Sequence, residues 1–208
     1  MNNYQDYVIK DGQFIGKFEE MYRDCEDPWN ASTEAYESSP CSVTVKQLLQ
    51  DLPPPVSLIS IGSGTGRHLE WVRPYHANAD DYGDGVECSA VAVARSIAQY
   101  EWNTIYTSDA LTFMHDHRTL YTVYLFREVL WYILPDWAEI VALLKAYHRG
   151  AMVIVELSFY DDQQYGREYF DGPDDFIAKW PFGIGKIVRE HTTKQQRQGR
   201  VMIAGRVD

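Results

Sequence analysis

The stretch that decides the fold is Ser57–Trp71, SLISIGSGTGRHLEW. It begins with an apolar run typical of a buried strand, continues with glycine at every second position (Gly62, Gly64 and Gly66), and ends in a pattern that predicts a helix. Because glycine adopts positive φ and has no side chain, the backbone of such a turn can approach a ligand closely. Taken alone, the G-x-G-x-G spacing leaves open a dinucleotide, another adenosine-containing ligand and a purely structural turn.

Outward from this stretch, apolar runs alternate with helical patterns. The sequence predicts strands at 56–61, 83–87, 104–108, 121–126 and 151–157, with helices at 67–75, 90–100, 110–115 and 136–148 between them. Strands that are apolar on both faces and separated by helices are typical of a parallel sheet covered by helices. Two final strands, at 185–191 and 200–207, flank a polar segment and predict a hairpin. We therefore expect an α/β fold, Rossmann-like and doubly wound. Its mostly parallel seven-stranded sheet ends in an antiparallel hairpin, with helices on both faces.

Composition narrows the class of partner. The chain has 208 residues, which suits one domain, and a formal net charge of −11, which disfavours nucleic acids and anionic membrane surfaces. The charge is compatible with a neutral or cationic small molecule. Three distant cysteines without a C-x-x-C spacing indicate free thiols in a reducing, cytoplasmic compartment. Neither a signal peptide nor an apolar run of membrane-spanning length is visible.

Acidic residues follow the next two predicted strands. Glu87 ends the second strand, about 20 residues beyond the glycine turn, where an acid can accept both hydroxyls of a ribose. Asp109 ends the third strand, where it can accept a hydrogen bond from an adenine amine or cap the following helix. Because parallel strands end at one edge of a sheet, the glycines and both acids are expected to meet there.

With these motifs, the chain resembles the class I S-adenosylmethionine-dependent methyltransferases over roughly residues 14–207. The motifs are ISIGSGTG for the glycine loop, GVECS and SDA for the next two strand ends, and FREVLWYI after the fourth strand. More narrowly, FEEMYRDCEDPW, followed by AYE, resembles the small nodulation-type N-methyltransferases. The resemblance implies one domain, 1–208, with an N-terminal helical cap (1–55), a cofactor-binding core (56–159), an acceptor-side insertion (160–184) and a terminal hairpin (185–208).

The resemblance also implies S-adenosylmethionine as the cofactor and a role for individual residues. The methionine and ribose parts would face the glycine loop, the second strand end would hold the ribose, the third would hold the adenine, and an N-terminal pair would close over the ligand. These residues are Gly62, Ser63, Gly64 and Gly66; Glu87 and Cys88; Asp109 and Ala110; Arg127 beside the methionine; and Tyr22 and Trp29. The family usually has an acid two places before the first glycine, where this chain has Ser60.

The implied reaction is methyl transfer to a small-molecule acceptor, an amine or a hydroxyl, possibly sugar-like. Glu128 is the candidate base; the alternative is a carboxylate paired with Arg127 or facing solvent. Nucleic-acid aminomethyltransferases carry Asn/Asp-Pro-Pro-aromatic after the fourth strand, whereas this chain has LFRE. The aromatic, acidic segment 160–182 either covers the acceptor or forms a small satellite core, and Trp131 and Tyr132 face the same choice.

Two further functions remain open from the sequence. A non-catalytic module could keep the fold and the ligand, and a nicotinamide-dependent oxidoreductase is disfavoured by the glycine spacing and the hairpin. His115 and His117 stand at positions i and i+2, which do not share a helix face, so we expect a surface loop and no metal site. His68 is placed either near the cofactor or at the surface.

Overall fold

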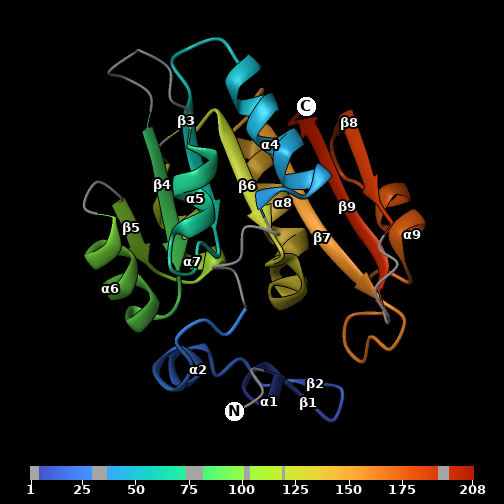
Figure 1. Ribbon diagram of the computed structural model, residues 1–208. Coiled ribbons are helices and arrows are strands. Elements are labelled where there is room, and N and C mark those ends of the chain that lie inside the picture. The colour runs from blue at the N-terminus through green and yellow to red at the C-terminus, as the bar shows by residue number, and fades with distance from the viewer. Residues whose placement is uncertain (1–4, 30–36, 74–81, 101–103, 119, 192–196) are drawn as a thin grey trace.

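A seven-stranded sheet forms the centre of the computed structural model, which describes residues 5–29, 37–73, 82–100, 104–118, 120–191 and 197–208. Its strands are β3 (Ser57–Ile61), β4 (Tyr82–Glu87), β5 (Thr104–Thr107), β6 (Val123–Arg127), β7 (Met152–Tyr160), β8 (Gly183–Glu190) and β9 (Arg197–Arg206). They lie in the order β5-β4-β3-β6-β7-β9-β8 (Figure 1). The first five are parallel, and β9 runs antiparallel to both of its neighbours, β7 and β8. The predicted fold class is confirmed.

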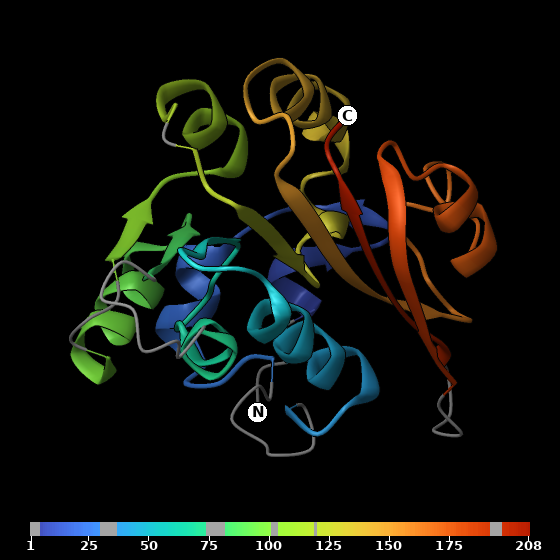
Figure 2. The same ribbon diagram turned by 90° about the horizontal axis from the view of Figure 1, so that it is seen from above.

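Helices cover both faces of this sheet (Figure 2). They are α4 (Pro40–Asp51), α5 (Arg67–Val72), α6 (Ala90–Gln99), α7 (Ala110–Asp116), α8 (Trp137–Tyr147) and α9 (Pro173–Ala178). On one face α4 and α5 bury apolar side chains such as Val45 and Leu69. On the other, α7 and α8 bury Phe113, Ile140 and Leu144. Burial of a sheet on both sides explains why its strands read as continuous apolar runs.

The pleat of β6 decides which side chains reach the ligand-binding edge. Tyr124 and Phe126 face the layer of α7 and α8, whereas Val123 and Leu125 face α4 and α5. Since side chains alternate along a strand, Arg127 also lies on the α4 and α5 side. The last residue of the strand is therefore polar and lies on the same side as α4 and α5.

The N-terminal segment departs from its prediction. The apolar spacing of residues 14–24, FIGKFEEMYRD, predicts one helix, but Gln13–Phe14 is β2, paired with β1 (Ile9–Lys10) after the short helix α1 (Gln5–Val8). Helix α2 begins only at Phe18 and ends at Asp24. The backbone N–H groups of Ile15 and Lys17 donate to carbonyls of α1, at 2.8 Å each, and Gly16 adopts a φ of +59°. These bonds hold the chain out of the helical geometry that its apolar spacing indicated.

Other elements also differ from the prediction in their bounds or content. The helix predicted over 67–75 ends at Val72, because Arg73 precedes a proline and takes an extended ψ of 128°. The excursion predicted over 160–182 contains α9, whose first residue is proline and whose first turn is acidic, both common at helix starts. In addition, β7 runs on to Tyr160, three residues beyond the predicted strand.

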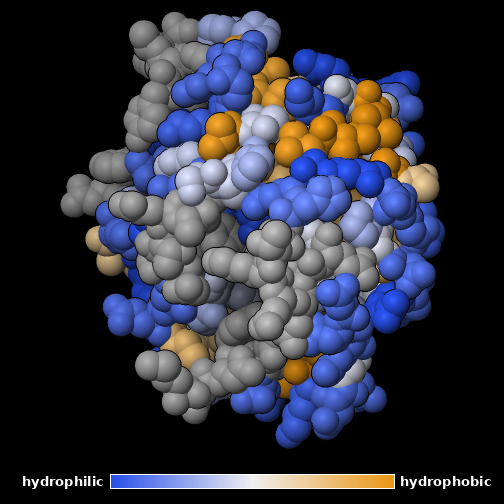
Figure 3. Space-filling view, turned by 45° about the vertical axis from the view of Figure 1, so that its right-hand side comes forward, coloured by the Kyte–Doolittle hydropathy of each residue, from blue (hydrophilic) through white to orange (hydrophobic). Residues whose placement is uncertain are grey.

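Edge strand β8 forms the outer limit of the sheet. Its side chains are largely exposed, including Ile184 at 53% and Ile187 at 36%. On the face shown in Figure 3, apolar side chains gather in the upper part, where α4 and β8 lie. Within the described ranges, no helix has the length and apolar character needed to cross a bilayer.

Candidate functional site

A cavity of about 800 Å³ lies at the carboxyl edge of the sheet. It is lined by the glycine turn after β3, by the residues that end or follow β4, β5 and β6, by parts of the N-terminal segment 8–29, and by residues 160–165. This is the edge at which open α/β sheets bind ligands, and the volume is within the ~300–1,000 Å³ of small-molecule sites. A smaller pocket of about 350 Å³, lined by Leu52, Leu120 and His148, contains none of the predicted site residues.

The glycine turn is held tightly against β4. Gly62 and Gly64 have φ values of +68° and +57°, and a Cβ on Gly62 would lie 2.4 Å from Cγ2 of Val129. The Ser63 N–H donates to the Val86 carbonyl at 2.9 Å, which ties the turn to the neighbouring strand end. The turn therefore requires glycine both for its conformation and for its close contact with the segment after β6.

Glu87 joins this turn to the cavity. Its Oε2 accepts the Gly64 N–H at 2.9 Å, and its Oε1 accepts the Ser89 N–H at 2.9 Å and the Cys88 thiol at 3.4 Å. Burial raises the pKa of this carboxyl, and only 5% of the residue is exposed. A carboxylate has about four acceptor positions. Glu87, which lines the cavity, therefore keeps acceptor capacity for a ligand hydroxyl.

Asp109 and Ala110 reach the cavity from the end of β5. Asp109 is the N-cap of α7, and its Oδ1 accepts the Thr112 N–H at 2.9 Å. Burial tends to raise the pKa of Asp109, but the hydrogen bonds from Thr112 outweigh it and hold that pKa below its usual value. The capping role is confirmed, and contact with an adenine stays a prediction that uses the second carboxylate oxygen.

Tyr22 and Trp29 lie over the glycine turn. The Trp29 indole N–H donates to the Tyr22 hydroxyl at 2.8 Å, and that hydroxyl would lie 3.0 Å from a Cβ on Gly64. Helix α2 is fastened beside them, because the Glu19 carboxylate accepts from the Ser89 hydroxyl at 2.7 Å. The two aromatic residues thus line the cavity on the side opposite the sheet.

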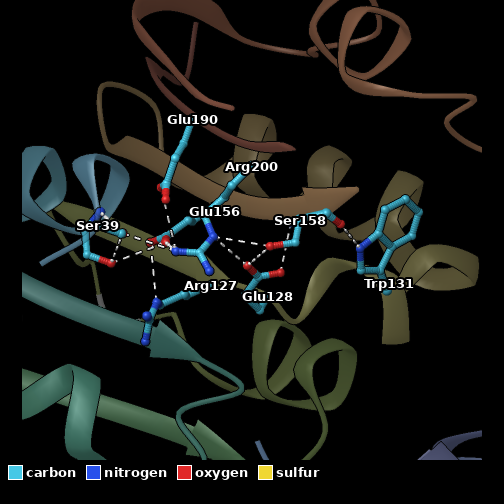
Figure 4. A network of polar contacts seen from close by, with 9 residues as sticks. Ser39, Arg127, Glu128, Trp131, Glu156, Ser158, Glu190 and Arg200 are labelled. Atoms are coloured by element: carbon cyan, nitrogen blue, oxygen red, sulfur yellow. Dashed lines mark hydrogen bonds and ion pairs between the residues drawn. The ribbon is translucent and has the colours of Figure 1, made fainter. Parts of the chain in front are cut away.

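A buried network of charges lies beside the cavity (Figure 4). Arg127 pairs with Glu156 at 3.4 Å, and Arg200 contacts both Glu156 at 3.3 Å and Glu128 at 3.1 Å. Burial raises the pKa of Glu156, although the two guanidinium groups act against that rise. The sequence left Glu128 open as a carboxylate paired with Arg127. In the structure, its arginine partner is Arg200 and not Arg127.

The carboxylate of Glu128 is largely committed within this network. Its Oε1 accepts from the Ser158 hydroxyl at 2.6 Å and its Oε2 from the Ser158 N–H at 2.9 Å. Glu128 also has a φ of +52°, which a residue other than glycine adopts at a cost of about 1–3 kcal/mol. Glu128 lines the cavity, but its hydrogen bonds favour a positioning role over proton transfer.

His68 and Ser60 complete this side of the cavity. Neither ring nitrogen of His68 has a hydrogen-bond partner among the described residues. Burial, with the charges of Arg127 and Arg200, holds the pKa of His68 well below its usual value, so the ring is neutral. Of the two placements left open by the sequence, the structure selects the cavity. The position of His68 after the glycine turn indicated this placement, but its charged neighbours, Arg127 and Arg200, come from strands far along the chain.

The aromatic segment after β7 divides between the two predicted roles. Phe170, Phe176, Trp180 and Phe182 are buried in the core against the sheet. Tyr160 and Tyr165 line the cavity, as do Trp131, Tyr132, Phe14 and Phe18. The phenylalanines were not predicted to line the site, because the hairpin that places Phe14 there is invisible in the helical spacing.

The two histidines near residue 116 lie away from this cavity. His115 is in the last turn of α7, not in a loop, and its Nε2 lies 2.8 Å from Oε1 of Glu139. The ring of His117 stacks on Phe113 at 4.2 Å. In the part of the chain that the structure describes, no cluster of three or more metal-ligating side chains is found.

Comparison with known proteins places this fold. No family model and no curated protein matches the sequence. N-methyltransferase NodS from Bradyrhizobium japonicum WM9 is 13% identical with a TM-score of 0.59, covering 82% of this chain and 98% of that one. A protein solved for the conversion of a disulfide bond into a thioacetal group in echinomycin biosynthesis is 14% identical, with a TM-score of 0.64 and coverages of 92% and 91%.

Magnesium protoporphyrin IX methyltransferase from Synechocystis PCC 6803, solved with bound S-adenosylmethionine, is 16% identical with a TM-score of 0.51, covering 78% of each chain. The present chain spans 57% of the CurJ carbon methyltransferase, to which it is also similar. At these identities the comparisons establish the architecture. The chain has the Rossmann-like fold of the S-adenosylmethionine-dependent methyltransferases.

Proposed function

We propose that this protein is an S-adenosylmethionine-dependent methyltransferase whose acceptor is a small molecule with an amine or hydroxyl group, sugar-like molecules included. The observation that carries the proposal is the Glu87 carboxylate. It accepts the N–H of a positive-φ glycine turn, retains acceptor capacity, and faces a cavity of about 800 Å³ that continues beyond the turn. Solved proteins of the same fold are named as methyltransferases, which supports the activity.

The residues present fit this cofactor. Glu87 would hold the ribose hydroxyls with Cys88 beside it, Asp109 and Ala110 would hold the adenine, and Tyr22 and Trp29 would cover the ligand. The glycine turn, residues 62–66, would lie against the methionine and ribose. Two residues that line the cavity carry buried polar side-chain atoms with no hydrogen-bond partner among the described residues, the Ser63 hydroxyl and the His68 ring nitrogens. Since buried polar groups are normally paired, these two support a polar ligand.

The methionine end would meet Ser60, His68 and Arg127. Arg127, paired to Glu156, supplies positive charge there and favours the methionine carboxylate. Ser60, in place of an acid, supplies a hydroxyl and no negative charge for the ammonium. Neutral His68 can donate from one nitrogen and accept at the other, so it suits a zwitterion.

When bound, the cofactor supplies a methyl group on a positively charged sulfur. The protein has to align the acceptor and exclude water, because the departing thioether is neutral. Glu128 holds the segment after β6 in place through its contacts with Ser158 and Arg200. The free thiols of Cys25, Cys41 and Cys88 support a cytoplasmic location.

Titration calorimetry with S-adenosylhomocysteine tests the proposal. We expect one site per chain, and the same protein should transfer labelled methyl groups to a panel of small amines and alcohols. Absence of binding by the folded protein would overturn the proposal. Binding without any product across the panel would favour the second function, a non-catalytic module, which the replacement of an acid by Ser60 and the hydrogen-bonded state of Glu128 also favour.

A further inference from the structure

One half of the cavity is built from aromatic rings. This aromatic half is defined by the lining residues within 8–18, 131–136 and 160–165. Phe14 stacks on Tyr132 with ring centroids 6.0 Å apart and on Tyr165 at 5.7 Å. Phe18 meets Tyr132 edge-on at 5.3 Å. Four rings from three distant segments therefore form one continuous aromatic wall.

Charge in the aromatic half has a single sign. Asp136 and Asp162 line it, and none of its described lining residues is Lys, Arg or His. The cations that line the cavity, Arg67 and Arg127, belong to the other half, and each is paired with a glutamate. A cation gains from the ring faces and from both carboxylates, whereas an anion is repelled and a neutral alcohol gains neither.

The chemistry of the site also discriminates between acceptors. An aliphatic hydroxyl needs a base in the transition state, and both oxygens of Glu128 already accept hydrogen bonds from Ser158. An ammonium group needs only to lose one proton to the solvent before it reacts. The nitrogen lone pair then forms the N–C bond as the C–S bond breaks, and the electron pair of that bond stays on sulfur.

We propose that the acceptor is a primary or secondary amine, positively charged in solution, that carries a flat apolar group. The inference rests on the proposed function and narrows it. The apolar group packs on the wall of Phe14, Phe18, Tyr132 and Tyr165, and the ammonium is drawn by Asp136 and Asp162. The negative charge of the whole chain, −11, supports the same preference at longer range.

Matched pairs of acceptors test this proposal. The protein and S-adenosylmethionine are incubated with benzylamine or benzyl alcohol, and with tryptamine or its alcohol analogue, and products are detected by mass spectrometry. We expect the amines to be methylated and the alcohols to remain unchanged. Methylation of the alcohols at comparable rates, or of no amine by a protein that binds S-adenosylhomocysteine, overturns the inference. If the wild-type protein does not bind S-adenosylhomocysteine, the proposed function itself is overturned.

Variants test the carboxylates separately. The double variant Asp136→Asn/Asp162→Asn should raise KM for the amine about threefold to tenfold, while the Kd of S-adenosylhomocysteine stays unchanged. The matched control is Asp161→Asn, since Asp161 is an exposed neighbour that does not line the cavity. Equal KM values in the double variant and the control, with melting temperatures preserved, would rule out recognition by charge.

Discussion

Replacement of Glu87 by glutamine should separate ligand binding from folding. Each carboxylate oxygen of Glu87 accepts one backbone N–H, from Gly64 at 2.9 Å and from Ser89 at 2.9 Å. An amide has one acceptor oxygen and one NH2 group, so Glu87→Gln places a donor against one of these N–H groups. It also removes the charge that strengthens a bond to a ribose hydroxyl.

The expected magnitude follows from these bonds. A hydrogen bond to a charged group contributes about 1.5–3 kcal/mol. Loss of one such bond to the ligand amounts to about 1.5–3 kcal/mol, whereas the donor–donor contact at the turn lowers the stability of the free protein as well. The Kd of S-adenosylhomocysteine should therefore rise about 10-fold or more, at 1.36 kcal/mol per factor of ten. Titration calorimetry measures the change, with a melting curve recorded without ligand.

Asp84→Asn is the matched control for this substitution. Asp84 lies on the same strand, is also buried, and has a pKa raised by burial, but it bonds the Tyr121 hydroxyl at 2.8 Å and does not line the cavity. The control should lower the melting temperature and leave the Kd unchanged. If folded Glu87→Gln protein binds within twofold of the wild type, the assignment of Glu87 to the ribose is wrong.

Three further predictions concern stability. Gly62→Ala should lower the free energy of unfolding, measured in urea, by about 1–3 kcal/mol, because its Cβ would clash with Val129 and its φ is positive. Adding Val129→Ala should recover part of that loss. Equal instability of the single and double variants would contradict the contact. Burial lowers the pKa of both His68 and His148, so below about pH 6.5 the unfolded chain binds protons that the folded chain does not bind. The free energy of unfolding should therefore fall, as the pH is lowered, by up to about 1.4 kcal/mol per pH unit for each histidine. His148→Gln should reduce this pH dependence in melting curves, and an unchanged pH dependence would contradict the assignment. Arg200→Met should destabilise the protein by about 3–5 kcal/mol at pH 7 in denaturant titrations. The loss should be smaller at pH 5, because the carboxylates left unpaired can take up protons there. A loss of stability that does not depend on pH would contradict the charge pairing.

The sequence predicted the sheet and the edge at which the cavity lies because both depend on local patterns. Buried parallel strands are apolar throughout, and the residues that follow them meet at one edge whatever the details of packing. Gly62, Glu87 and Asp109 could therefore be brought together from the sequence alone. Their shared position is a property of the topology and not of particular side-chain contacts.

The partners of Glu128 and the surroundings of His68 could not be predicted in the same way. Glu128 meets Arg200 only because β9 is inserted between β7 and β8, an order that a hairpin pattern does not specify. Phe14 was misplaced for a related reason. Its apolar spacing matched a helix, but backbone bonds to α1 and the positive φ of Gly16 select a hairpin. Tertiary contacts overrode a local pattern in both cases.

The position of β9 has a consequence for the order in which the protein is made. Arg200 donates to the hydroxyl of Ser39, 161 residues earlier, and pairs with the carboxylates of Glu128, directly after β6, and Glu156 on β7. Until the ribosome has released residues 197–206, Glu156 has no guanidinium from β9 beside it, and β8 has no strand on which to pair. Contacts between residues far apart in the sequence form slowly, because the distant segments must first meet. Synthesis of the first five strands therefore leaves the cavity's charged border incomplete, and binding competence should arise as a late, abrupt step.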